Sequence, residues 1–260
     1  MREAGLSLME PRVRWGWIVA SAALYVAFLV ASAPASVLAW ALAAMTNGVV
    51  TVAGVQGSVW HGHALALIVS IRPSSVHRFE QLRWNWLGTR LVAGELAYRI
   101  KIEDRALHGA TTIALSSEGV RADDATFRLP AASASVYLPQ LAAASFSGDV
   151  SLQSEQFLFS QNAYRGVATV EWRNAASTLS DVRPLGEYRV RVTGRGPQME
   201  FSLITLGGAL HLEGLGTWSQ REGFFFKGDA QADAANQSRL IGLLRSIGKD
   251  SGKGAYSFRI

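Results

Sequence analysis

The chain has 260 residues, of which 49% are hydrophobic and 17% are charged, a balance that excludes a disordered or strongly solvated protein. It has no cysteine, which excludes disulfides, thiolate zinc sites, iron–sulfur clusters and a cysteine nucleophile. The formal net charge of +5 comes from basic residues spread singly along the chain, so the sequence indicates no nucleic-acid-binding surface.

A long apolar segment near the N-terminus predicts a transmembrane helix. Residues 15–33 read WGWIVASAALYVAFLVASA, which as a helix would span about 28 Å, close to the hydrocarbon thickness of a bilayer. A cleaved signal peptide is the alternative, because residues 31–33 resemble a cleavage site. Pro34 disfavours a cut at that point, a cut after Ala35 stays open, and the apolar stretch is longer than the ~7–15 residues of a signal peptide. The sequence therefore favours a retained anchor, and a second apolar run at residues 37–44 is too short to span.

The flanking charges predict the orientation of this anchor. Arg2, Arg12 and Arg14 precede it, and the next basic residue is Arg72. Because basic flanks remain on the cytoplasmic side of a membrane, we expect the N-terminus in the cytoplasm. The chain then divides into a cytoplasmic tail (residues 1–14), a transmembrane anchor (15–36) and one domain outside the cytoplasm (37–260).

Alternation of apolar and polar residues after the anchor predicts a mainly β domain. In residues 95–103 every second residue, from Leu96 to Ile102, is apolar and most of the others are polar, which is typical of a strand with one buried face. The same pattern returns at residues 187–192 and 256–260. Less regular strand candidates are residues 48–55, 64–71, 111–115, 148–152, 156–159, 166–172, 199–203, 209–214 and 224–231. Many short strands separated by glycines predict an antiparallel sheet, either curved or folded as a sandwich.

One helix is predicted near the C-terminus. In residues 235–247, apolar side chains recur at three- and four-residue spacing, and Gly248 follows as a C-cap. The tract at residues 248–254 contains glycines and lysines but lacks the order of a phosphate-binding Walker loop, so we interpret it as a turn before the last strand.

Residues that could carry chemistry are few and scattered. His61 and His63 lie on one side of a predicted strand, but no third metal ligand follows at a suitable spacing, so we interpret them as ordinary polar residues. Asp123 and Asp124 could form an acidic pair, but neighbouring strand residues point to opposite faces, so we assign them to a turn. We therefore expect no catalytic, cofactor-binding or metal-binding residues and no enzymatic activity.

Aromatic residues are the remaining candidates for a functional surface. Large rings give much contact area at low entropic cost and suit either a core or an apolar groove that contacts a partner or a lipid. The candidate partner or lipid contacts are Trp60, Trp84, Trp86, Trp218, Phe224 and Phe226.

A set of short motifs in a fixed order resembles protein N of the bacterial type II secretion system. They follow the N-terminal anchor and are spread along the whole chain. The motifs are residues 57–62 (GSVWHG), 82–84 (LRW), 91–98 (LVAGELAY), 184–189 (PLGEYR), 212–219 (LEGLGTWS) and 226–230 (FKGDA), with Leu243, Leu244, Gly252 and Tyr256 near the C-terminus.

The resemblance implies a single-pass protein of the bacterial inner membrane with a periplasmic β-rich domain. It implies a non-enzymatic accessory component that contacts other inner-membrane subunits of the secretion system and supports export of folded proteins across the outer membrane. The alternative is a periplasmic lipid-binding or lipid-transfer protein of AsmA-like type, which would present a curved sheet with an apolar interior to membrane lipid. Neither function requires a cofactor or nucleic acid.

Overall fold

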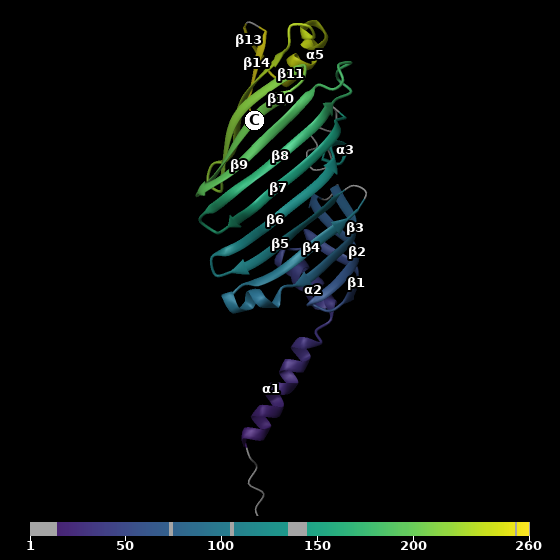
Figure 1. The fold of residues 1–260 in the computed structure, drawn as a ribbon, viewed down its shortest axis with the longest axis vertical. Helices are drawn as coiled ribbons and strands as arrows, with labels where there is room; N and C mark the ends of the chain where they lie inside the picture. Colours follow the sequence, from purple (N-terminus) through teal and green to yellow (C-terminus); the bar gives the residue numbers. More distant parts are fainter. Residues whose placement is uncertain (1–14, 73–74, 105–106, 135–144, 253, 260) are drawn as a thin grey trace, which may run out of the picture.

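The computed structural model describes the whole chain except residues 1–14, 73–74, 105–106, 135–144, 253 and 260. Its main feature is one antiparallel sheet of 14 strands, in which β1 to β12 lie side by side in sequence order and β14 and β13 complete the sheet (Figure 1). The strands are β1 (Val50–Gly57), β2 (His61–Arg72), β3 (Ser75–Trp86), β4 (Leu96–Glu103), β5 (His108–Ser116), β6 (Gly119–Pro130), β7 (Ser147–Phe159), β8 (Tyr164–Ala176), β9 (Gly186–Gly196), β10 (Gln198–Gly207), β11 (Leu210–Ser219), β12 (Gly223–Ala232), β13 (Lys249–Gly252) and β14 (Ala255–Arg259).

A few helices accompany the sheet. Figure 1 shows α1 projecting away from the β1 end of the sheet and α5 lying at the opposite end, beside β14. The helices are α1 (Trp15–Ala31), α2 (Ala35–Met45), the 3-10 turn η1 (Gly88–Ala93), α3 (Ala131–Ala134) and α5 (Gln237–Ile247). Among the described residues, no helix combines the length and the apolar character needed to cross a membrane.

The predicted fold class is confirmed for the sheet and for the C-terminal helix. The sheet is curved and open rather than a sandwich, and α5 is followed by two strands instead of one. The interpretation of residues 248–254 as a turn was wrong, because residues 249–252 form the edge strand β13. The assignment of Asp123 and Asp124 to a turn was also wrong, because both lie inside β6.

Register across the sheet places apolar residues on one face without interruption. Residues paired across neighbouring strands share a face, so the pairing can be followed from β1 to β14. One such row contains Val55, Ala64, Leu82, Ile102, Gly109, Phe127, Leu152, Val170, Val190, Leu203, Gly214, Gly228 and Phe258. We call the face that carries this row the inner face and the opposite one the outer face.

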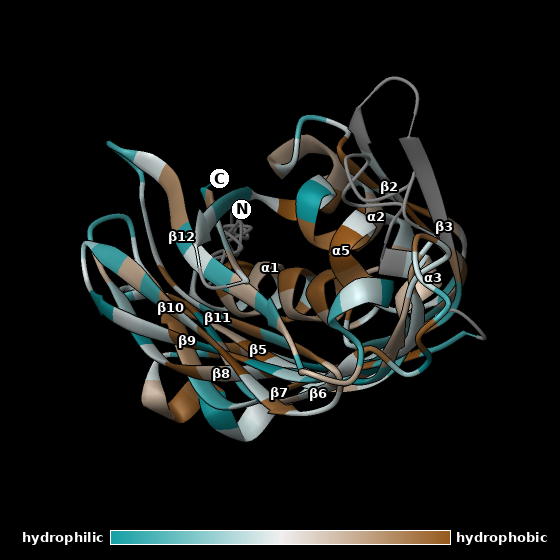
Figure 2. Cartoon of the chain, turned by 90° about the horizontal axis from the view of Figure 1, so that it is seen from above, coloured by the Kyte–Doolittle hydropathy of each residue, from teal (hydrophilic) through white to brown (hydrophobic). Residues whose placement is uncertain are grey.

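Bulges bend the sheet around its inner face. The pairing register shifts between Ala110 and Thr112 on β5 and between Ser154 and Phe157 on β7, and Asp124 on β6 has a φ of +50°. An extra residue in one strand increases the local twist and bends the strand, so a series of bulges curls a wide sheet. Seen from above, the strands form an arc around α2 and α5 (Figure 2).

Two helices cover the ends of the inner face. At the β1 end, Ala35 of α2 packs in a cluster with Leu82 and Trp84. At the other end, Leu240 and Leu244 of α5 are fully buried in a second cluster, which includes Ala230 and Tyr256 of the sheet. The two clusters form the hydrophobic core of the described residues, and the middle of the sheet belongs to neither.

Candidate functional site

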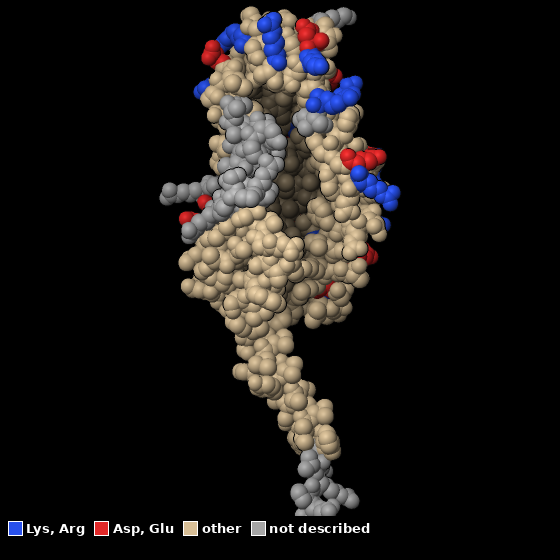
Figure 3. Space-filling model, turned by 180° about the vertical axis from the view of Figure 1, so that it is seen from behind, with Lys and Arg blue, Asp and Glu red and all other residues tan. Residues whose placement is uncertain are grey.

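The inner face of β7 to β10 forms an apolar trough between the two covered ends. Its floor consists of Leu152, Ala168, Val170, Val190, Val192, Met199, Phe201 and Leu203, which are all half-buried. Figure 3 shows this trough as a long hollow, and the charged side chains visible in that view lie on its rims and ends. The floor is therefore a continuous apolar surface that the helices leave uncovered.

The polar groups that face the trough are engaged with the sheet itself. The hydroxyl of Ser154 donates to the carbonyl of Val167 at 2.9 Å, and that of Thr205 donates to the carbonyl of Leu212 at 2.8 Å. Tyr188 donates its hydroxyl to the Leu210 carbonyl at 2.9 Å, and burial raises the pKa of this phenol. A ligand in the trough consequently meets hydrocarbon and engaged hydroxyls rather than open donors and acceptors.

Glycines opposite aromatic residues let the rings lie across the inner face. A Cβ added to Gly214 would lie 2.6 Å from the ring of Phe226, and one added to Gly216 would lie 2.5 Å from the same ring. Phe226 in turn stacks on Phe258 with ring centroids 6.0 Å apart. Glycine at these positions thus gives the rings of the neighbouring strands the space they occupy.

The six aromatic candidates all lie on or beside the inner face, but in different roles. Trp84 and Phe226 are buried in the sheet, whereas Phe224 is 48% exposed. Trp60, in the β1–β2 connection, lies 4.5 Å from Trp86 between ring centroids. Trp218 contacts Tyr164 edge-on at 5.4 Å. Their use as partner or lipid contacts stays a prediction, and the structure places three of them at the β1 end of the sheet and three on β11 and β12.

Trp60 also joins the sheet to the N-terminal helix. Its indole Nε1 lies 3.0 Å from the carbonyl oxygen of Val30 and 3.1 Å from that of Ala31. These carbonyls belong to the last turn of α1, where the carbonyls no longer have the regular hydrogen-bond partners of a continuing helix; that of Val30 also accepts from the Ala33 amide at 3.3 Å. Trp86, beneath Trp60, has a buried Nε1 without a hydrogen-bond partner among the described residues.

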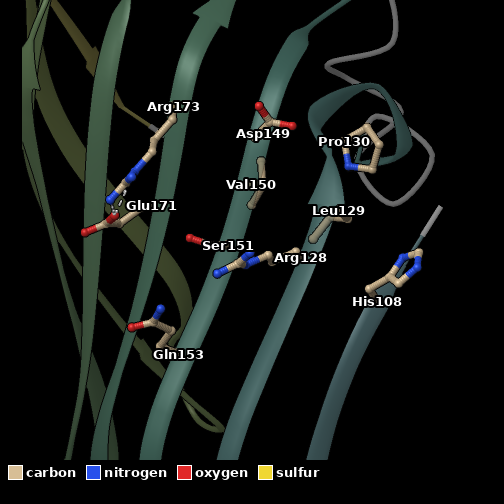
Figure 4. Close-up of a pocket in the computed structure, with 10 residues that line it drawn as sticks. All are labelled: His108, Arg128, Leu129, Pro130, Asp149, Val150, Ser151, Gln153, Glu171 and Arg173. Carbon is tan, nitrogen blue, oxygen red and sulfur yellow. Dashed lines mark hydrogen bonds and ion pairs between the residues drawn. The ribbon is translucent and has the colours of Figure 1, made fainter. Parts of the chain in front are cut away.

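The outer face carries polar depressions. One of them, of about 610 Å³, lies over β5 to β8 (Figure 4). It is lined by His108, Arg128, Leu129, Pro130, Asp149, Val150, Ser151, Gln153, Glu171 and Arg173. His108 and Glu171 occupy one row of paired residues but are three strand spacings apart, about 14 Å, which is too far for proton transfer between them.

Glu171 is held as a structural ion pair. Its Oε1 accepts from Arg189 Nη2 at 2.7 Å and its Oε2 accepts from Arg173 Nη2 at 2.8 Å. These hydrogen bonds lower the pKa of Glu171, with that from Arg189 as the largest cause. A carboxylate stabilised in its charged form is a poor proton acceptor, so this depression does not assemble an acid–base pair.

A second network fastens η1 to the sheet. Arg121 Nη2 lies 2.7 Å from Glu95 Oε2, and Arg121 Nε lies 2.9 Å from Asp123 Oδ1. Arg90 of η1 reaches the same two carboxylates at 3.1 and 3.4 Å. Asp123, which the sequence analysis placed in a turn, is therefore a buried carboxylate in a network of two arginines and two acids.

The two histidines that the sequence places on one strand, His61 and His63, lie on β2. Both are exposed there. Within the described residues no group of three or more His, Cys, Asp or Glu side chains is placed to hold a metal ion.

Sequence reasoning missed both the trough floor and the charge network. The floor residues come from four consecutive strands, and only the register between these strands shows that their side chains share one face. The alternation of apolar residues was a signal for one apolar face, but it did not show how much of that face a helix would cover.

Comparison with known families gives a match over most of the chain. A family model described as type II secretion system (T2SS), protein N, matches residues 48–259. Comparisons with curated proteins and with solved structures give no match.

The Glu95 network predicts a pH-dependent contribution to stability. The pKa of Glu95 is lowered from its ordinary value of 4.5, chiefly by the hydrogen bond from Arg121 and then by that from Arg90. A carboxyl with a lowered folded-state pKa stabilises the fold fully above its unfolded pKa and loses this contribution as pH falls through its folded pKa. We expect Glu95→Gln to be less stable than the native chain at pH 7, and the difference to narrow below about pH 4.5.

The measurement is the thermal unfolding midpoint of the full chain in detergent between pH 3 and pH 7, about the range in which carboxyl groups titrate. Glu103→Gln is the matched control, because Glu103 pairs with Arg83 at 3.9 Å in an exposed position and such pairs contribute little. A difference between Glu95→Gln and the native chain that stays constant across this pH range would contradict the prediction.

Proposed function

We propose a non-enzymatic accessory role in protein export for this chain, which belongs to the protein N family of the type II secretion system. The chain is thus a secretion-system component, and the finer proposal is that it supports export of folded proteins across the outer membrane. The observation that carries the proposal is the extent of the family match, since residues 48–259 include every strand of the sheet.

We propose further that α1 and α2 hold the sheet at the inner membrane. α1 is apolar along its whole length and has no buried residue, so the sheet provides no cover for it. On α2, Trp40 and Met45 are 71% and 76% exposed, although the same helix packs Ala35 against the sheet. Exposed apolar side chains on two consecutive helices support a membrane contact at this end of the molecule. With the N-terminus in the cytoplasm, the sheet would lie in the periplasm.

Partner subunits would contact the edge of the sheet at β1. An open sheet presents unpaired backbone groups at its edge strands, and another chain can add a strand there. The edge at β13 has only four residues, and Lys249 and Asp250 among them protect it from pairing. β1 is twice as long, contains no charged residue and lies beside α2, where membrane-embedded subunits would be within reach.

Cysteine accessibility tests the proposed topology. The native chain has no cysteine, so Ser7→Cys and Ser117→Cys each introduce a single reporter, in the N-terminal tail and in the exposed β5–β6 turn. In cells with a permeabilised outer membrane, we expect a membrane-impermeant maleimide to label the cysteine at position 117. We expect the same reagent to label the cysteine at position 7 only after the cells are lysed. Labelling of both in intact inner membranes, or loss of the N-terminal reporter from the mature chain, would contradict a retained anchor.

Photo-crosslinking tests the proposed partner edge. A benzophenone amino acid in place of Ala53, which is exposed on β1, should yield adducts with other subunits of the secretion system. The same amino acid in place of Val167, which is 43% exposed on the outer face of β8, is the matched control and should yield few. Equal adducts at both positions, or none at Ala53, would place the partner contact elsewhere.

Secretion itself tests the proposed function. In a strain whose chromosomal copy encodes the chain without residues 48–259, we expect secreted substrates to accumulate in the periplasm, because the anchor alone lacks the sheet that would contact partners. The full chain supplied on a plasmid is the control and should restore export. Undiminished export by the truncated chain would reject an accessory role in secretion.

A further inference from the structure

We propose that the trough binds the acyl chains of a membrane phospholipid. This inference adds a ligand to the sheet and rests on the membrane attachment proposed for α1 and α2, but it requires no particular partner subunit. It starts from the uncovered floor at Leu152, Val170, Val190 and Leu203, whose apolar side chains stay half-buried while both ends of the same row are covered by helices.

The size of the floor fits one or more acyl chains. Phe127 on β6 packs against the cluster at one end, and Leu212 on β11 packs against the cluster at the other. These two strands are five strand spacings apart, about 24 Å. The hydrocarbon region of one bilayer leaflet is about 15 Å deep, which is the depth that one acyl chain spans. The floor is wider than this, so an acyl chain fits along it.

The chemistry of the floor favours hydrocarbon over a peptide. A peptide lying in the trough would bring backbone N–H and C=O groups, each of which needs a hydrogen-bond partner when it is removed from water. The hydroxyls of Ser154 and Thr205 already donate to backbone carbonyls of the sheet. An acyl chain needs no such partners and gains free energy in proportion to the apolar area it removes from water.

The position of the trough provides a source for the lipid. α1 leaves the sheet at the β1 end, and Trp60 ties the last turn of α1 to that end through the carbonyls of Val30 and Ala31 (Figure 1). The inner face continues from the residues around Trp60 and Trp86, along the row that includes Phe157, to the floor of the trough. A row of apolar residues therefore connects the proposed membrane contact with the trough.

A photoactivatable phospholipid tests this inference on the full chain. The native protein is reconstituted into vesicles of phosphatidylethanolamine and phosphatidylglycerol that contain a trace of phosphatidylethanolamine with a diazirine in one acyl chain. After irradiation, mass spectrometry locates the adducts along the digested chain. We expect adducts on residues of β7 to β10 in addition to adducts on α1, which contacts the surrounding bilayer.

Two variants and one matched control sharpen the test. Val170→Asp places a carboxylate on the floor, and Val167→Asp places the same group on the outer face of the same strand, where Val167 is already 43% exposed. We expect Val170→Asp to reduce trough adducts about tenfold relative to Val167→Asp, because a carboxylate against an acyl chain loses its hydration. Ala168→Trp fills the space over the floor without adding charge and should also reduce the trough adducts. It tests the inference even if Val170→Asp does not fold.

The adduct map separates this inference from the proposed function. Adducts confined to α1 and α2 would overturn lipid binding in the trough and leave the anchor in place. Adducts in the trough but none on α1 would support the ligand and contradict the anchor. Trough adducts that persist equally in Val170→Asp, Ala168→Trp and Val167→Asp would also overturn the inference, because they would not depend on the floor.

Discussion

The fold depends on how the apolar side chains on one face of a 14-stranded sheet are removed from water. Fully burying a Val or Leu side chain stabilises a fold by about 1.5–3 kcal/mol, so an apolar face needs cover along its whole width. In this chain α2 covers one end and α5 covers the other, and curvature brings the face around both. The floor side chains Val170 and Val190 stay half-buried. A hydrocarbon chain bound there would remove their remaining apolar surface from water, which is favourable.

The outer face carries the ion pairs that link neighbouring strands of the sheet. The ion pairs between described strand residues use outer-face side chains, such as Arg83 with Glu103 and Arg195 with Glu200. Where they are shortest, at Glu95 and Glu171, each carboxylate accepts from two arginines and has a lowered pKa. These ion pairs link neighbouring strands and keep the outer surface hydrated. Their carboxylates stay charged at neutral pH and are unsuited to proton transfer there.

The sequence indicated most strands of the sheet, including several that bulges interrupt, and missed β3, β6 and β13. Residues 95–103 predicted β4 almost to the residue, because every second side chain from Leu96 to Ile102 faces inward. β6 was missed because an extra residue near Asp124 reverses the alternation halfway along the strand, and two adjacent aspartates then resemble a turn. From the sequence, the apolar run within α2 was considered only as a second membrane span and found too short. Nothing in the composition of α2 shows that this helix packs on the sheet. The trough floor could not be predicted, because it depends on the register of four strands and on the extent of helical cover.

The end of the sheet near α1 connects the two surfaces on which both proposals depend. Trp60 hydrogen-bonds to carbonyls of α1 and packs on Trp86, so the orientation of the helix is coupled to the first strands of the sheet. β1, the edge available for a partner strand, and the inner face that leads to the trough both begin there. A partner that pairs with β1 would therefore act on the same strands that carry the apolar row leading from the proposed membrane contact. Partner binding and lipid access would then be linked through β1 to β3 without any change at the distant end held by α5.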